Sequence, residues 1–197
     1  MKCYVLAGGL SSRMGADKWS LEIDGESFAD RVISAAGSAF DEVFVVTKKG
    51  RGTFSVPVIH EANVEVAAPI IGLDCALDHA AGKACWVLGV DYPLVTADVL
   101  SYLRERFESS GAEIAVPEIS SKLHMLCAGY RATTAASVKA KIAGGRLALK
   151  GLVDAHRALV IHEDELVGRF GRAVLMNVNT PEDLEEARRR HAEAQAG

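Results

Sequence analysis

Short apolar runs alternate with amphipathic stretches along the first half of the chain. Apolar and β-branched residues predict buried strands at 3–6, 41–47, 56–60 and 84–90. Apolar positions at helical spacing predict helices over 26–40 and 70–81. Strands that alternate with helices in this order are typical of parallel βαβ units. The run at 84–90 is apolar throughout, so we expect it to be a central strand.

The second half of the chain is predicted to extend the same sheet. Further strands are expected at 113–117, 124–130, 173–176 and, at a sheet edge, 158–162. Helices are expected from the N-cap Thr96 through about Ser109, over 133–143, and from Thr180 and Pro181 into a polar C-terminal tail. The fold class that follows is α/β. We expect a single three-layer α/β/α domain over residues 1–197, with a mostly parallel, Rossmann-like sheet and helices on both faces.

Composition and charge narrow the class of protein. The 197 residues suffice for one full core, and the net charge of -4 argues against a basic nucleic-acid-binding face. The N-terminus does not combine a basic segment with a long apolar one, and no apolar run approaches a membrane span. We therefore expect a cytoplasmic protein that binds neither nucleic acid nor membrane.

The cysteines do not form a metal-binding pattern. Cys3, Cys75, Cys85 and Cys127 are widely scattered, without a C-x-x-C pair. This spacing argues against a zinc site and predicts four buried, reduced thiols.

The first predicted strand leads into a glycine-rich loop over residues 6–18. Gly8 and Gly9 allow a sharp turn and a close approach to a ligand, because they carry no Cβ. Successive backbone N–H groups in such a loop form a concavity that binds anions. Arg13 and Lys18 add positive charges suited to phosphate. The loop therefore predicts a polyphosphate site.

The spacing in this loop excludes the two commonest phosphate motifs. Gly8, Gly9 and Gly15 do not match G-x-G-x-x-G, and Lys18 is followed by Trp19 rather than by Ser or Thr. The pattern L-A-G-G-x-S-x-R-M-G-x-D-K instead resembles the signature loop of nucleotidyltransferases, which move a nucleoside monophosphate from an NTP. An ordinary glycine-rich turn is the alternative, but the glycines and the two basic residues together favour the phosphate loop.

Asp91 directly follows the predicted central strand. Ligands of open α/β sheets gather outside the carboxyl ends of the strands, where this carboxylate is expected. On its own Asp91 fits a turn-forming role equally well, since Asp-x-Pro favours turns. Beside a phosphate loop, a Mg²⁺ ligand is favoured, because Mg²⁺ binds one or two carboxylates together with phosphate oxygens. Arg13, Lys18 and Asp91 are the predicted catalytic residues.

Segments beyond the loop extend the resemblance to most of the chain. They are Asp91-Tyr-Pro93, Pro69-Ile-Ile-Gly-Leu73 and Asn177-Val-Asn-Thr-Pro-Glu-Asp-Leu184. In this order they resemble the molybdenum cofactor guanylyltransferases, the MobA-like proteins. The resemblance implies Mg²⁺-dependent transfer of GMP from GTP to the terminal phosphate of molybdopterin, or of its metal-loaded form. The products are a guanine dinucleotide cofactor and pyrophosphate.

The resemblance also implies which residues bind the nucleotide. They are Leu6, Ala7, Gly8, Gly9, Gly15, Lys18, Thr47, Glu61 and Asp91. Leu6, Ala7 and Gly8 would present backbone groups to guanine and ribose. Glu61 stands where the family commonly has Asp, and Thr47 stands at about the place of a frequent Asn. Residues 68–72 read Ala-Pro-Ile-Ile-Gly instead of Gly-Pro-Leu-Ala-Gly. These departures affect the base contacts more than the phosphate and metal contacts.

The acceptor is anionic and contains a pterin, so arginine and amide groups are expected around it. By resemblance the candidates are Gly72, His124, Arg146, Asn177 and Asn179. Each polar candidate has a structural alternative. His124 could be a packed strand histidine, Arg146 a helix-end charge, and the asparagines turn formers. Trp19 and Trp86 are predicted to pack rather than to bind.

Two other functions remain open. One is a sister nucleotidyltransferase that acts on a sugar phosphate, on a methylerythritol phosphate or, with CTP, on molybdopterin. The other is a catalytically silent nucleotide-binding or partner-docking protein. The preference for GTP or CTP would distinguish a sister nucleotidyltransferase, and a measurement of turnover would distinguish a catalytically silent protein. The resemblance further implies partners among molybdenum-cofactor pathway or acceptor enzymes.

Overall fold

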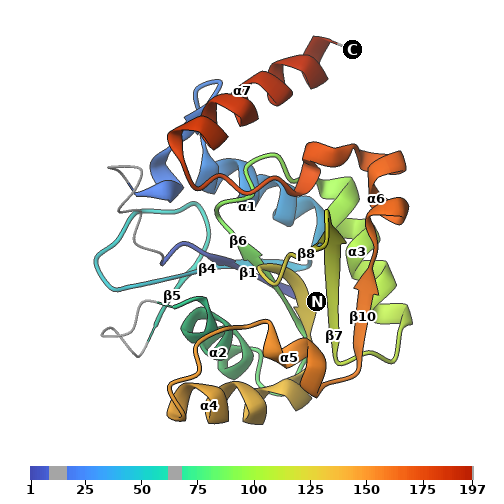
Figure 1. The fold of residues 1–197 in the computed structure, drawn as a ribbon. Helices are drawn as coiled ribbons and strands as arrows, with labels where there is room; N and C mark the ends of the chain where they lie inside the picture. The colour runs from blue at the N-terminus through green and yellow to red at the C-terminus, as the bar shows by residue number, and fades with distance from the viewer. Residues whose placement is uncertain (9–16, 62–67, 197) are drawn as a thin grey trace.

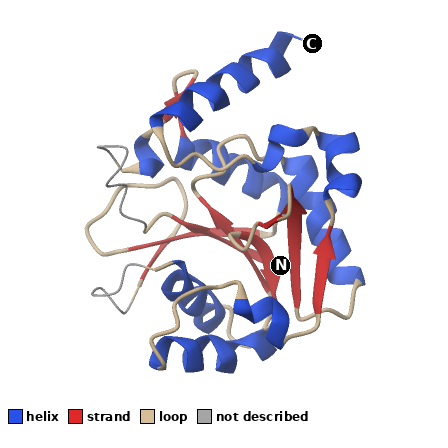
Figure 2. Ribbon diagram, viewed as in Figure 1, coloured by secondary structure: helices blue, strands red, loops and turns tan. Residues whose placement is uncertain are grey.

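The protein is built around one twisted, mostly parallel sheet (Figures 1 and 2). The structure is a computed structural model that describes residues 1–8, 17–61 and 68–196. Within these residues the sheet order is β10-β7-β9-β6-β1-β4-β5, and β8 pairs with β7. The strands are β1 (Lys2–Leu6), β4 (Glu42–Thr47), β5 (Val58–His60), β6 (Cys85–Gly89), β7 (Ile114–Ile119), β8 (Lys122–Leu123), β9 (Cys127–Tyr130) and β10 (Ala158–Ile161).

One strand in the middle of this sheet order, β9, runs against the strands on either side of it. β1 runs parallel to β4 and β6, β4 runs parallel to β5, and β10 runs parallel to β7. β9 runs antiparallel to both of its neighbours, β6 and β7. The predicted mostly parallel sheet is confirmed, and β10 lies at an edge as expected.

Helices cover both faces of the sheet, which confirms the three-layer α/β architecture (Figure 1). The helices are α1 (Phe28–Ala39), α2 (Pro69–His79), α3 (Ala97–Ser109), α4 (Ala135–Ala143), α5 (Gly151–Ala155), α6 (Glu163–Phe170) and α7 (Pro181–Ala196). Side chains alternate along β1 because successive residues of a strand point to opposite faces. Cys3 and Val5 enter the core shared with α1 and α3, whereas Tyr4 and Leu6 enter the core shared with α2 and α4.

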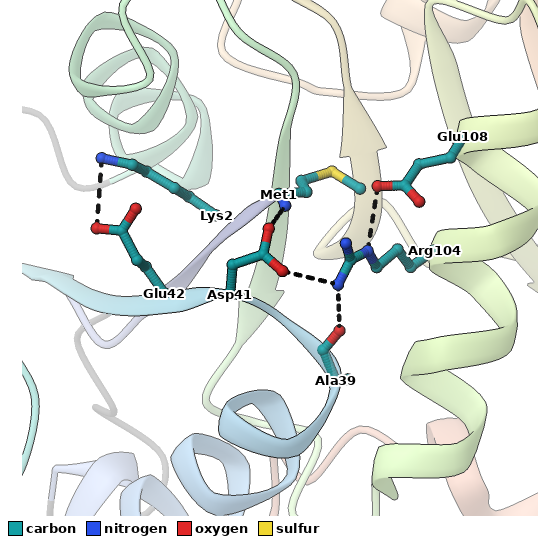
Figure 3. A network of polar contacts seen from close by, with 7 residues as sticks. All are labelled: Met1, Lys2, Ala39, Asp41, Glu42, Arg104 and Glu108. Atoms are coloured by element: carbon teal, nitrogen blue, oxygen red, sulfur yellow. Dashed lines mark hydrogen bonds and ion pairs between the residues drawn. The ribbon is translucent and has the colours of Figure 1, made fainter.

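At the amino ends of the strands, a network of polar contacts ties α1 to α3 (Figure 3). Arg104 donates to the carbonyl of Ala39, with 2.9 Å between Nη1 and O, and pairs with Asp41 and Glu108. Asp41 also pairs with the amino group of Met1. The amino ends of the strands lie opposite their carboxyl ends, where the candidate site is found.

Three sequence predictions need correction. The segment predicted as a strand at 173–176 is instead a 3₁₀ helix, Arg172–Leu175, which buries Val174 and Leu175. A run of so few apolar residues fits a short helical turn as well as a strand. The helix predicted from residue 26 begins at Phe28, because residues 22–27 form a hairpin of β2 (Glu22–Ile23) and β3 (Glu26–Ser27). The strand predicted from 124 begins at Cys127.

Several short helices were not predicted from the sequence. They are α5, α6 and the 3₁₀ helices Lys18–Ser20 and Ala132–Thr134. All four cysteines are free thiols, and three of them are buried as expected, whereas Cys75 is partly exposed. Thr96 is confirmed as an N-cap, because its Oγ1 accepts from the amide of Val99. None of the described helices is both long enough and apolar enough to cross a membrane.

Candidate active site

A cavity of about 240 Å³ opens at the carboxyl ends of β1 and β6. Its walls include seven of the predicted site residues. They are Leu6, Ala7, Gly8, Lys18, Glu61, Asp91 and Asn179. The chain stays hydrogen-bonded as it leaves β1, because the amide of Ala7 donates to the carbonyl of Val46 at 2.9 Å. The cavity therefore has a rigid floor of backbone where the sequence predicts the nucleotide.

The carboxylate of Glu61 lies directly against the main chain of Gly8. A Cβ at Gly8 would stand 2.7 Å from Glu61 Oε1, so a larger residue there would push this carboxylate away from the main chain. Glu61 is held by its own backbone, because its amide donates to the carbonyl of Thr47 at 3.0 Å. Glu61 as a whole residue is 9% exposed. Burial raises the pKa of Glu61, and the charge of Lys48 partly opposes this shift. The site thus holds a desolvated acceptor group beside the glycine loop.

The two carboxylate oxygens of Asp91 differ, because one accepts a hydrogen bond and the other has no donor among the described residues. Its Oδ2 accepts from Nδ2 of Asn177 at 3.1 Å, and Nζ of Lys18 lies 3.8 Å from the same oxygen. Its Oδ1 is buried, and no donor among the described residues reaches it. A Cβ at Gly89 would collide with Oδ1, so a larger residue two positions before Asp91 would displace this carboxylate oxygen.

The chemistry of Asp91 Oδ1 fits a divalent cation. A buried carboxylate oxygen without a donor costs free energy unless a positive charge compensates it. Among the described residues, no group of three or more His, Cys, Asp and Glu side chains is arranged to hold a metal ion. Mg²⁺ does not need such a group, since it often binds one or two carboxylates together with phosphate oxygens. Asp91 is thus the residue that could hold it here.

Lys18 is fixed in place by neighbours on two sides. Its Nζ donates to Oδ1 of Asn179, in addition to the contact with Asp91. The adjacent Trp19 packs its ring against Phe54, with centroids 5.5 Å apart, which confirms its predicted packing role. Trp86 is fully buried, as expected. The ammonium group of Lys18 is therefore held at the cavity wall before any ligand binds.

The segment before α7 crosses the carboxyl ends of the strands and carries both asparagines. Val178 between them is fully buried, and its amide donates to the carbonyl of Asp91 at 2.9 Å. Asp183 accepts from the amides of Asn179 and Thr180, while Oγ1 of Thr180 accepts from the amide of Asp183. This reciprocal capping pair fixes the start of α7 and confirms Thr180 as the predicted cap.

A second groove adjoins the cavity and contains His124 and Asn177, and it shares Asn179 with the cavity. His124 lies in the turn before β9, where its Nδ1 is 3.2 Å from the hydroxyl oxygen of Tyr92. It is 5% exposed. Burial and, secondarily, the charge of Lys122 lower the pKa of His124 to about 4. His124 is therefore neutral at physiological pH and cannot act as a cation toward an anionic acceptor.

The shifted pKa of His124 predicts a pH dependence of stability. The free energy of unfolding is expected to be at its full value above pH 6.5 and to fall between pH 6.5 and about 4, because only the unfolded state gains the proton there. His124→Gln should flatten this part of the profile in urea unfolding. An NMR titration in which His124 gains its proton near pH 6.5 would contradict this expectation.

Three candidates lie apart from the cavity. Gly72 packs in α2, where a Cβ would stand 2.9 Å from Cδ1 of Leu6. Thr47 is fully buried, and no partner among the described residues reaches its Oγ1. Arg146 is exposed between α4 and α5 and is not among the residues that line the cavity. Gly72 and Thr47 thus support the site through packing and backbone contacts.

Three further candidates, Gly9, Arg13 and Gly15, lie outside the described residues.

Lys122, which lines the second groove, was not among the site residues predicted from the sequence. Lys122 on β8 donates to Oδ1 of Asn177, with 3.2 Å between the atoms. β8 has only two residues, too few for a periodic pattern, and its contact with Asn177 spans 55 positions. His124, two positions after Lys122, was predicted as a site residue, and it is the sequence feature that could have pointed to Lys122.

Residues 3–160 match the family model of the MobA-like NTP transferase domain. The chain belongs to this family. A relative in Aquifex aeolicus (strain VF5), named "Probable molybdenum cofactor guanylyltransferase", is 36% identical over 185 residues, which cover 92% of this chain and 87% of that protein. The MobA-like chain is thus aligned with this relative over most of both lengths.

Solved structures share the fold of this chain. Molybdopterin-guanine dinucleotide biosynthesis protein A from Archaeoglobus fulgidus superposes with a TM-score of 0.85 at 22% identity, covering 98% of this chain and 100% of that one. At that identity the likeness shows the fold. A protein from Aquifex aeolicus VF5 superposes with a TM-score of 0.75 at 34% identity, covering 91% and 93%. The MobA-like chain is a nucleotidyltransferase.

Proposed function

We propose that this chain transfers GMP from GTP to the terminal phosphate of molybdopterin, free or metal-loaded. The observation that carries the proposal is the cavity where Glu61, Lys18 and Asp91 meet at the carboxyl ends of the sheet. A carboxylate for a base, a cation for phosphates and a free carboxylate oxygen for Mg²⁺ are the groups this reaction needs. The name of the Aquifex aeolicus relative supports guanine and the molybdenum cofactor as the substrates.

The proposed mechanism is a direct in-line displacement. A phosphate oxygen of the acceptor attacks the α-phosphorus of GTP, and pyrophosphate leaves. Phosphoryl transfer of this kind depends on positioning and charge neutralisation, so it requires no protein nucleophile. Lys18 would bind the phosphates from the position that Asn179 gives it. Bound Mg²⁺ would neutralise charge on the phosphates, with Asp91 as its ligand.

Other residues of the glycine loop complete this proposal. Gly9 and Gly15 would bring backbone N–H groups to the phosphates, and Arg13 would add a second positive charge. Leu6, Ala7 and Gly8 would contact the guanosine through their backbone. Enzymes of the molybdenum-cofactor pathway, or those that receive the product, are the proposed partners.

Glu61 is the proposed determinant of the base. Guanine presents N1–H and N2–H₂ on one edge, and both can donate to a single carboxylate. Adenine and cytosine each present a lone pair at the corresponding ring nitrogen, which an ionised carboxylate repels. Because Glu61 lies against Gly8 and is nearly buried, an unpaired group there costs the full desolvation free energy.

Replacement of this carboxylate tests the base contact. Glu61→Gln is expected to weaken GTP binding by about 10- to 100-fold, the loss typical of charged hydrogen bonds. Since burial raises the pKa of Glu61, GTP affinity of the unmodified protein should fall with decreasing pH before an ordinary carboxyl would titrate, and the variant should not show this fall. Calorimetry over a pH series measures both effects. Glu42→Gln, at the opposite edge of the sheet, is the matched control (Figure 3).

Nucleotide preference is the first experiment for the function as a whole. GTP and CTP binding are compared by calorimetry with and without Mg²⁺, and pyrophosphate release is then measured with molybdopterin as acceptor. The proposal expects Mg²⁺-dependent preference for GTP and release that requires the acceptor. Preference for CTP would assign a cytidylyl transfer instead. Binding of GTP without turnover would indicate a silent nucleotide-binding protein.

A further inference from the structure

A chain of polar contacts leads from β8 to the free carboxylate of the site. Nζ of Lys122 donates to Oδ1 of Asn177 at 3.2 Å, and Nδ2 of Asn177 donates to Oδ2 of Asp91 at 3.1 Å. The three side chains come from separate parts of the chain, with 55 and 86 positions between the partners. Lys122 therefore reaches Asp91 only through Asn177.

The charge of Lys122 favours one of the two orientations of the Asn177 amide. A primary amide has an acceptor at one end and donors at the other, and its two orientations have nearly the same shape. Rotation of this amide by half a turn would place its NH₂ group against the ammonium of Lys122. The same rotation would place its oxygen against the carboxylate of Asp91. Both contacts would then be repulsive. The positive charge of Lys122 therefore favours the orientation that donates to Asp91, in addition to the side-chain contacts of Asn177 with His124 and Tyr92.

The hairpin that carries Lys122 is itself held in place. Ser120 and Ser121 form its turn with φ values of 52° and 60°, which serine rarely adopts. The amide of Ser120 donates to Glu163 of α6 at 2.8 Å, and Arg172 donates to Oγ of Ser120 at 3.3 Å. These contacts fix the tip of the hairpin next to Lys122, which limits where the ammonium group can move.

The hydrogen bond from Asn177 affects how Asp91 meets Lys18. Nζ of Lys18 is 3.8 Å from Asp91 Oδ2, longer than a direct charge-assisted hydrogen bond. Without the donor from Asn177, rotation of the carboxylate would close this ion pair. A closed pair would turn Asp91 away from its free position and would remove Lys18 from the phosphates.

We propose that Lys122 is a positioning residue which, through Asn177, keeps Asp91 open toward a divalent cation. This inference rests on the proposed metal-dependent transfer. Lys122 itself touches neither Asp91 nor Lys18 in any described contact. Its effect should therefore appear in metal affinity and should depend on Asn177.

The test measures Mn²⁺ affinity by electron paramagnetic resonance in the presence of GTP and, separately, of CTP. Lys122→Met is expected to weaken Mn²⁺ binding about tenfold, the lower end of the effect of groups that orient a metal ligand. Lys122→Arg, which keeps the charge, should recover most of the affinity. Lys139→Met is the matched control, because Lys139 pairs with Asp74 and Asp78 on the surface of α2 and α4.

The double variant separates positioning from a general structural effect. Asn177→Leu should weaken Mn²⁺ binding at least as much as Lys122→Met, and adding Lys122→Met to it should have no further effect. Additive losses would overturn the inference. So would unchanged Mn²⁺ affinity in Lys122→Met. A raised KM for molybdopterin in that variant would then make Lys122 an acceptor contact.

The outcomes distinguish this inference from the proposed function. A protein that prefers CTP would overturn guanylyl transfer, yet its Mn²⁺ affinity with CTP would still test Lys122. A protein that binds Mn²⁺ with neither nucleotide would overturn both.

Discussion

Asp91→Asn is expected to lower kcat by about 10³-fold or more, the scale of losing a charge that neutralises the transition state. The substitution keeps the shape of the side chain, and the donor from Asn177 can still be accepted by the amide oxygen. What disappears is the negative charge that attracts Mg²⁺. The rate of pyrophosphate release at saturating GTP and acceptor measures this loss.

The stability of the Asp91→Asn variant should not fall with its activity. A buried carboxylate oxygen without a donor destabilises the folded state, so its replacement by a neutral amide should leave the free energy of unfolding unchanged or slightly higher. Asp98→Asn, at an exposed position in the first turn of α3, is the matched control. If the variant of Asp91 folds normally and retains near-normal turnover, the metal-ligand assignment is wrong.

Lys18→Met should lower kcat/KM by about 10²- to 10³-fold, because it removes a prepositioned positive charge from the phosphates. GTP binding should weaken as well, by about tenfold. Methionine keeps the length of the aliphatic chain, so the packing of the neighbouring Trp19 on Phe54 should survive. Steady-state kinetics and calorimetry together separate the loss in rate from the loss in binding.

The same substitution at Lys139 provides the control for Lys18. Lys139 lies on α4, pairs with acidic residues of α2 and does not line the cavity. Its variant should bind and turn over GTP normally. Kinetics of Lys18→Met that match this control would show that the cation at the end of the glycine loop has no part in the reaction.

Much of the layout of the site could be predicted from the sequence, because it depends on strand order. The uninterrupted apolar run that became β6 located Asp91 at its carboxyl end, and β1 located the backbone of Gly8 next to it. The contact of Glu61 with Gly8 could not be foreseen, because β5 has only three residues, too few for a periodic pattern that would fix where the next side chain points.

Contacts between distant side chains were beyond sequence reasoning. Asn177 was predicted to contact the acceptor substrate. The structure shows that its side-chain amide is hydrogen-bonded to Lys122 and Asp91. Asn179 is likewise committed to Lys18. Spacing along the chain reports which elements form, but these pairs depend on how α7 and β8 are placed around the sheet. The packing role of Gly72 could not be predicted either, because it depends on how α2 packs on Leu6.

The antiparallel course of β9 gives one side of the site a different character from the other. β1 and β6 deliver strand ends to the cavity, whereas β9 delivers the turn that precedes it, with the carbonyl of Leu126 accepting from the amide of Gly89 at 2.6 Å. β8 and β9 both run antiparallel to β7, so residues 124–126 connect two segments that run in the same direction beside it. Leu126 in this turn lines the nucleotide cavity, whereas His124 lines the second groove. A change in the length of this turn is therefore expected to alter the preference for an acceptor and the preference for a nucleotide together.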